Sequence, residues 1–155
     1  KAGLQVGALY NYFPDKQTIL SELLINHMEN LLQTWHRQKL PEKSDKLLEF
    51  FVDFHIEYHL NCPEEVFIAY MELRNLTPDN FKKIEKLRNK YELILNKILS
   101  DGVNKNFFSC EETKIASLAI IGMLKEVNTW YKKDGRISVP EIKNIYQKIV
   151  LKAVT

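Results

Sequence analysis

Apolar residues recur at helical spacing along almost the whole chain, and this periodicity constrains the fold more than any other feature. No segment alternates between apolar and polar residues over a useful length, as a half-buried strand would. The five prolines, at positions 14, 41, 63, 78 and 140, all fall at or near the expected starts of helices. Because pattern and punctuation agree, we predict an all-α fold.

Several local signals set the expected helix boundaries. Asp15 is the expected N-cap of a long helix over residues 15–38. Ser109 with Glu112, and Ser138 with Glu141, have the spacing of capping boxes that begin two further helices. The expected helices span residues 15–38, 44–60, 62–75, 78–102, 109–133 and 138–153.

Composition excludes some classes of protein and permits others. Hydrophobic residues make up 45% of the 155 positions, which is enough for a packed core. The net charge of +2 argues against a surface coated in basic residues but permits a local basic patch. Cys62 and Cys110 form no metal-type cluster, so we expect free thiols in a cytoplasmic protein, with a disulfide between them as the alternative. The longest near-apolar run, residues 115–124, is too short to cross a bilayer, so no membrane association is expected.

Residues 2–20 have the features of the second half of a helix-turn-helix that reads DNA. Gly7 and Ala8 lack bulky side chains and allow the backbone to approach phosphate, and Tyr10, Asn11 and Tyr12 follow them on a short helix. We expect Gln5 and Asn11 to contact base edges, because amide side chains pair well with bases. Tyr10, Tyr12, Gly7 and Lys16 are expected to contact the DNA backbone. The alternative is that Tyr10 and Tyr12 only cover the edge of the core.

This segment resembles the signature of the tetracycline-repressor-like (TetR) family of bacterial regulators. The family pattern is Ala-Gly-Val-Ser-x-Gly-Thr-Leu-Tyr-x-Tyr-Phe-x-x-Lys-x-x-Leu-Leu, and Leu4, Gln5 and Ala8 depart from it. The residues that match are Ala2, Gly3, Gly7, Leu9, Tyr10, Tyr12, Phe13, Lys16 and Leu20. The resemblance implies DNA contacts from Gln5, Val6, Gly7, Ala8, Tyr10, Asn11, Tyr12 and Lys16.

The same resemblance implies a division of the chain and a partner subunit. Residues 1–16 would be the C-terminal part of the DNA-binding domain, whose first helices are expected to be absent from this chain. Residues 17–155 would bind a ligand and form a homodimer through the last two long helices. The expected interface residues are Leu118, Gly122, Met123, Ile142, Tyr146 and Ile149. The alternative for each is a place in the core of its own chain.

The body of the chain is rich in aromatic residues, and a helical body of this kind can enclose an apolar cavity. Polar residues within the apolar stripes are the more informative candidates, because a buried arginine needs an anionic partner. That partner could be Glu72, Glu92 or a ligand. The candidate ligand-binding residues are Phe54, His55, Tyr58, Tyr70, Arg74, Arg88, Tyr91, Asn128 and Trp130. An ordinary packed core remains the alternative.

A second, weaker resemblance concerns the class of ligand. Trp130, Tyr131, Gly135, Arg136 and Ser138 match a pattern of TetR-like regulators of fatty-acid and acyl-CoA degradation, Gly-Met-x-Asn-Trp-x-x-x-Trp-Tyr followed by Gly-Arg-Leu-Ser. Lys125 and Glu126 replace its Asn-Trp pair. The resemblance implies an acyl-CoA or fatty-acid effector, with a drug-like apolar compound or another metabolite as alternatives.

Other classes of function have weaker support. His55 and His59, four residues apart, could hold a metal with Glu64 or Glu65, but the chain has no His-Glu-x-x-His motif. It also lacks Gly-x-Ser-x-Gly, phosphate-loop and dinucleotide-binding motifs. A purely structural dimerising protein would not need the segment over residues 2–20. We therefore expect a ligand-responsive repressor of operator DNA, with no catalytic residue, cofactor or metal.

Overall fold

The computed structural model describes residues 15–155, and all regular structure in that range is helical. The predicted all-α fold is therefore confirmed. The elements are α2 (Lys16–His36), α3 (Ser44–Asn61), α4 (Pro63–Met71), the 3₁₀ helix η1 (Leu73–Asn75), α5 (Pro78–Asn104), α6 (Thr113–Lys125), α7 (Val127–Trp130) and α8 (Val139–Val154). None of these helices is long and apolar enough to span a membrane.

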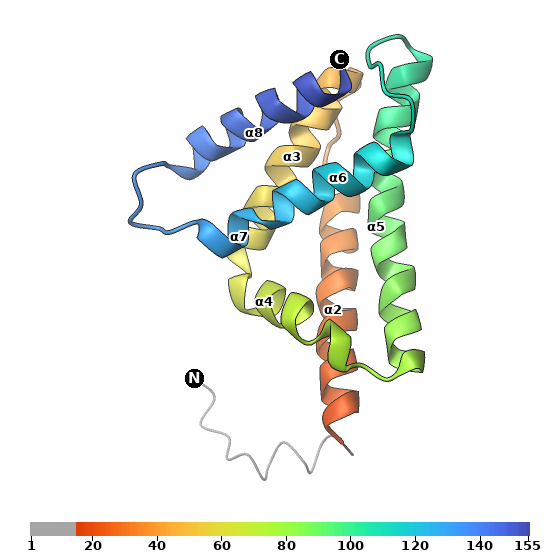
Figure 1. Cartoon of the computed structure of the whole chain (residues 1–155), viewed down its shortest axis with the longest axis vertical. Coiled ribbons are helices and arrows are strands. Elements are labelled where there is room, and N and C mark those ends of the chain that lie inside the picture. The colour runs from red at the N-terminus through yellow and green to blue at the C-terminus, as the bar shows by residue number, and fades with distance from the viewer. Residues whose placement is uncertain (1–14) are drawn as a thin grey trace.

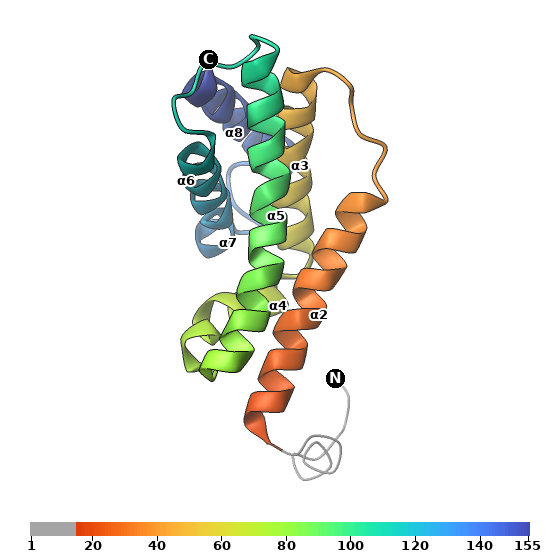
Figure 2. The ribbon, with the colours of Figure 1, turned by 90° about the vertical axis from the view of Figure 1, so that its right-hand side faces the viewer.

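The long helices pack around a shared apolar core. α2 and α5 run side by side over much of their length, and α3 packs against α5 (Figure 1). α6 and α8 both lie on the same side of α3, as the two views show (Figures 1 and 2). The core is built from the apolar stripes of these helices, with the largest fully buried side chains at Leu24, Leu31, Leu48, Phe51, Ile56, Ile84, Leu95, Leu99, Leu124 and Ile142.

Two of the expected helix caps are confirmed. Asp15 caps α2 by accepting a hydrogen bond of 2.8 Å from the backbone N–H of Thr18. Ser138 and Glu141 form the predicted capping box of α8, with the Ser138 N–H donating to Glu141 at 2.8 Å. These contacts satisfy backbone donors that have no partner within the helix.

The predicted capping box at Ser109 is wrong. The N-cap of α6 is Glu112, whose side chain accepts from the N–H of Lys114 at 3.2 Å. The N–H of Ser109 instead donates to the carbonyl oxygen of Val154 at 2.6 Å. This contact ties the loop before α6 to the end of α8, so Ser109 is held outside the helix.

The continuous helix expected over residues 109–133 is also wrong, because it breaks after Lys125. Side chains compete with the helical hydrogen bonds at the break: Thr129 donates to the Glu126 carbonyl at 2.7 Å, and Asn128 donates to the Lys125 carbonyl at 3.3 Å. The chain then forms only the short α7 before the loop that leads to α8. Similarly, the expected helix over 62–75 divides into α4 and η1.

Candidate functional site

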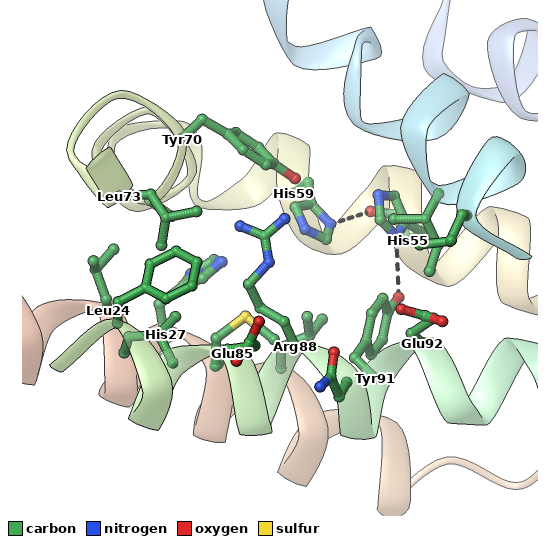
Figure 3. Close-up of a pocket in the computed structure, with 18 residues that line it drawn as sticks. Leu24, His27, His55, His59, Tyr70, Leu73, Glu85, Arg88, Tyr91 and Glu92 are labelled. Carbon is green, nitrogen blue, oxygen red and sulfur yellow. Dashed lines mark hydrogen bonds between the residues drawn. The ribbon is translucent and has the colours of Figure 1, made fainter. Parts of the chain in front are cut away.

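A cavity of about 330 Å³ lies among α2, α3, α4, η1, α5 and α6. This volume falls at the lower end of the range found for small-molecule sites. Its apolar walls come from residues of several helices, and they include Leu24, Met28, Leu31, Leu73, Ile84 and Ile121. Figure 3 shows the polar side chains that extend into it from α2, α3, α4 and α5.

Arg88 is the cation among the residues that line this cavity, and the carboxylates of Glu85 and Glu92 line it as well. The Arg88 side chain extends from α5 across the cavity, and the guanidinium lies toward Tyr70 and His59 (Figure 3). Within residues 15–155, no carboxylate lies within ion-pairing distance of Arg88. Glu72 and Glu92, the partners suggested by sequence, are therefore not paired with it. A guanidinium has five N–H donors, so the cavity offers a strong site for a carboxylate or carbonyl oxygen.

Two stacked histidines form the α3 wall of the cavity. The rings of His55 and His59 lie with centroids 4.0 Å apart. Since a carbonyl oxygen can only accept, His59 Nδ1 donates to the backbone oxygen of His55, at 2.8 Å. His55 Nδ1 shares a hydrogen bond of 3.1 Å with the hydroxyl of Tyr91. His55 Nε2 is buried and has no hydrogen-bond partner in the described part of the chain.

Burial keeps these histidines neutral. It lowers the pKa of His55 well below its usual value, and the neighbouring His59 adds to this effect. Burial also lowers the pKa of His59 to about 4, although its hydrogen bond to His55 opposes the shift. Burial lowers the pKa of His27 as well, with Glu65 opposing. At neutral pH Arg88 is therefore the cation of the cavity, while the histidines supply neutral donors and acceptors.

Tyrosine hydroxyls complete the polar lining. Burial raises the pKa of Tyr70, with the nearby Arg88 opposing that shift. Burial raises the pKa of Tyr91 well above its usual value. Both hydroxyls therefore remain protonated, and that of Tyr91 is already hydrogen-bonded to His55.

The structure brings together four of the candidate ligand-binding residues and separates the others. His55, Tyr70, Arg88 and Tyr91 all line the cavity. Phe54 and Tyr58 do not line it; they stack on each other with ring centroids 5.8 Å apart. Phe54 also packs edge-on against Trp35, at 5.1 Å. These two aromatic residues therefore contribute to packing between α2 and α3.

Three other candidates also lie outside this cavity. Arg74 lies exposed on η1, because the helix expected to bury it ends at Met71. Trp130 is 45% exposed at the end of α7, because the break after Lys125 changes the direction of the chain. Asn128 lines a separate cavity between α4 and α7.

Sequence reasoning missed several cavity residues. His27 lies on α2 three residues after Leu24 and four before Leu31, so its place on the apolar stripe could have identified it. Glu85 lies on α5 one helical turn before the candidate residue Arg88, so its spacing on the same helix face could have identified it. Leu73 and Phe81 reach the cavity only because of the turn between η1 and α5, which no periodicity predicts.

The candidate interface residues divide by burial. Leu118 and Ile149 are exposed on α6 and α8, whereas Met123 and Tyr146 are partly buried. A side chain added at Gly122 would meet nothing within 4 Å. Ile142 is only 1% exposed, because it packs into the core of its own chain, and it cannot offer its side chain to a partner without repacking.

The DNA-contact predictions concern a part of the chain that is mostly not described. Gln5, Val6, Gly7, Ala8, Tyr10, Asn11 and Tyr12 lie outside the described residues. Lys16 is the first residue of α2 and is exposed. In the range 15–155, no group of three His, Cys, Asp or Glu residues is placed to hold a metal ion. His55 and His59 instead contact each other, and His55 also bonds Tyr91.

Comparisons with known proteins agree with this architecture. A family model described as "Tetracyclin repressor-like, C-terminal domain" matches residues 41–154. The fatty acid metabolism regulator protein of Bacillus subtilis (strain 168) is 22% identical over 158 residues, which cover 99% of this chain and 81% of that protein.

Two solved structures illustrate the likeness in fold. The TetR family transcriptional regulator PfmR from Thermus thermophilus has a TM-score of 0.85 and 25% identity, covering 97% of this chain and 82% of that one. AibR in complex with isovaleryl coenzyme A and operator DNA has a TM-score of 0.81 and 18% identity, covering 92% of this chain and 78% of that one.

The all-helical fold of this chain is thus shared with proteins that regulate transcription. Since the family model covers most of its length, the chain belongs to the tetracycline-repressor-like family. The prediction of a ligand-responsive transcriptional regulator, and not an enzyme, is confirmed at the level of this family.

Proposed function

We propose that this protein is a cytoplasmic, homodimeric repressor that an acyl-type effector releases from operator DNA. The observation that carries this proposal is the combination of apolar cavity walls with one cation, Arg88, whose guanidinium lies toward Tyr70 and His59 in the cavity. An acyl chain would occupy the apolar part of the cavity, and its carboxylate or carbonyl oxygen would accept hydrogen bonds from Arg88.

Relatives support this class of effector. The Bacillus subtilis relative is named as a regulator of fatty acid metabolism, and AibR has been solved with isovaleryl coenzyme A. His59 and Tyr70 line the cavity beside Arg88 and add neutral polar side chains to it. A ligand that carries both a chain and an oxygen-bearing group would satisfy these features together.

The coupling to DNA would pass through the first turn of α2. Gln17 donates to the backbone oxygen of Asn75 at 2.6 Å and accepts from the N–H of Thr77 at 2.9 Å. These backbone groups lie between Leu73 and Phe81, which both line the cavity. A ligand that displaces this wall would therefore move the start of α2, which directly follows the segment proposed to read DNA, Gln5 to Tyr12. Ligand and operator would then favour different conformations.

The proposed dimer would use the outer faces of α6 and α8. Ile115 and Leu118 on α6, with Ile145 and Ile149 on α8, are large apolar residues exposed to solvent, and Leu118 also lines the cavity. Both helices lie on the same side of α3 (Figure 2). Exposed apolar patches of this kind are typical of an interface between subunits. A dimer would place two DNA-reading segments on the half-sites of one operator.

The test is effector binding by the wild type, Arg88→Gln and Arg74→Gln. Octanoate and octanoyl-CoA serve as probes, and isothermal titration calorimetry gives their affinities. We expect Arg88→Gln to weaken binding by about tenfold to a hundredfold, because it removes a charge-assisted hydrogen bond. Arg74→Gln removes the same charge outside the cavity and should leave the affinity within about twofold of wild type.

Two results would contradict the proposal. One is that neither acyl probe binds the wild type. The other is that both arginine variants lose affinity equally, since binding would then depend on overall charge and not on the cavity.

A further inference from the structure

The walls of the cavity that Arg88 lines differ in how far the rest of the chain covers them. The lining residues from α2 and α3 are all buried: Leu24, His27, Met28, Leu31, His55 and His59. The lining residues that are exposed come only from α5 and α6: Phe81, Glu85, Arg88, Asn89 and Leu118. The cavity therefore opens to solvent on the side where α5 and α6 lie.

Leu118 belongs both to this opening and to the face proposed to form the dimer. Its side chain lines the cavity from α6 and is 51% exposed. Ile115, about one helical turn before it, is 66% exposed, and Ile145 and Ile149 are exposed on the neighbouring α8. The opening of the cavity is therefore continuous with the proposed interface between subunits.

The opening has apolar side chains on both of its sides. Phe81 on α5 is 38% exposed, and Leu118 lies opposite on α6. The part of an acyl chain that lies at the opening would stay in contact with water, and it would contribute little free energy of burial. A cover that removes this part from water would tighten the binding of the effector.

A second copy of this chain meets the requirements for such a cover. A two-fold interface is formed by the same surface of both subunits, so an apolar face on one meets an apolar face on the other. The charged residues at the opening, Glu85 and Arg88, have opposite signs and do not favour a strongly charged partner. The apolar face of α6 and α8 that reaches the opening is the surface that a second copy would also present.

We propose that the partner subunit closes the effector cavity at Leu118, so that each subunit completes the binding site of the other. The effector then binds the dimer more tightly than the monomer, and by linkage it also stabilises the dimer. This inference rests on the proposed function, because it assumes an acyl effector in the cavity and a dimer through α6 and α8.

The first test measures by calorimetry how octanoate and octanoyl-CoA bind the wild type, Ile149→Glu and Leu40→Glu. Ile149 lies on the proposed interface and does not line the cavity, and Leu40 is a similarly exposed control in the loop between α2 and α3. We expect monomeric Ile149→Glu to bind the probes about tenfold more weakly, the effect of leaving two methylene groups in water. Leu40→Glu should bind them like the wild type.

The reciprocal test does not depend on the folding of Ile149→Glu. Ile149→Ala keeps the interface apolar and weakens the dimer, so that its dissociation can be followed by sedimentation equilibrium. Because a dimer holds two sites, a tenfold preference at each requires saturating probe to lower the dissociation constant of the dimer about a hundredfold.

Equal affinities of a folded, monomeric Ile149→Glu and the wild type would overturn the inference and leave the proposed effector site intact. An unchanged dissociation constant of the Ile149→Ala dimer at saturating probe would do the same. A dimeric Ile149→Glu would overturn the inference together with the proposed interface. If neither probe binds the wild type, the proposed function fails and the inference fails with it.

Discussion

His55 and His59 stack at 4.0 Å between ring centroids, a separation at which two imidazolium charges would repel each other. Both are buried, and each has one ring nitrogen in a hydrogen bond. The fold therefore holds them in the neutral form, which leaves Arg88 as the cation that lines the cavity.

This arrangement makes stability depend on pH. The pKa of His59 is about 4 in the folded chain, against 6.5 for an ordinary histidine. Between these values the unfolded chain binds more protons, so the free energy of unfolding falls as pH falls below about 6.5 and is fully retained above it. For His59 alone, the loss between pH values of about 7.5 and 5.5 is roughly 1 kcal/mol.

Urea unfolding at the two pH values checks this prediction. The wild type should lose stability at the lower pH, with the pKa shifts of His27 and His55 adding to the effect of His59. His59→Asn keeps a donor for the His55 carbonyl but cannot titrate, so its loss should be smaller by about 1 kcal/mol. An identical loss in the variant would show that His59 is not held neutral.

Single residues also show where sequence reasoning ends. Arg74 and Arg88 have similar sequence signals, an arginine beside an apolar stripe, and only the structure distinguishes them. Both arginines are exposed, but Arg88 lines the cavity from the continuous helix α5, whereas Arg74 lies on η1, beyond the end of α4, and does not line it. Tertiary context of this kind is not contained in local periodicity.

At the level of elements, periodicity predicted the long helices well because their apolar stripes are extended. α2, α3 and α5 begin and end within a few residues of the expected bounds. The break after Lys125 was missed because the residues beyond it keep a helical pattern. Local side-chain hydrogen bonds from Asn128 and Thr129 overcome that pattern.

The two serines with capping-box spacing provide a direct comparison. Ser138 caps α8, whereas Ser109 lies in a loop, and Glu112 caps α6 instead. Ser138→Ala should lower the free energy of unfolding by about 1 kcal/mol, because it removes the cap. Ser109→Ala should change it by less than about 0.5 kcal/mol. Chemical denaturation measures the free energy of unfolding of both variants. An equal decrease in the two would mean that α6 begins at Ser109.

For the whole molecule, the proposed dimer explains why apolar residues remain uncovered on α6 and α8. Ile149 on α8 is 44% exposed, and Leu40, in the loop between α2 and α3, is 43% exposed. Ile149→Glu should convert the dimer to a monomer, because it places a charge in the proposed interface. Leu40→Glu should remain dimeric. Light scattering after size-exclusion chromatography gives both masses, and a dimeric Ile149→Glu variant would exclude this face as the interface.

The central claim is that a ligand in the Arg88 cavity controls the release of DNA. The most direct measurement is the affinity of the intact gene product for a genomic fragment selected by its own binding, with and without octanoyl-CoA. We predict that octanoyl-CoA weakens DNA binding by the wild type at least tenfold and has little effect on Arg88→Gln at the same concentration. An unchanged DNA affinity in the presence of bound octanoyl-CoA, or an equal response from Arg88→Gln, would contradict the claim.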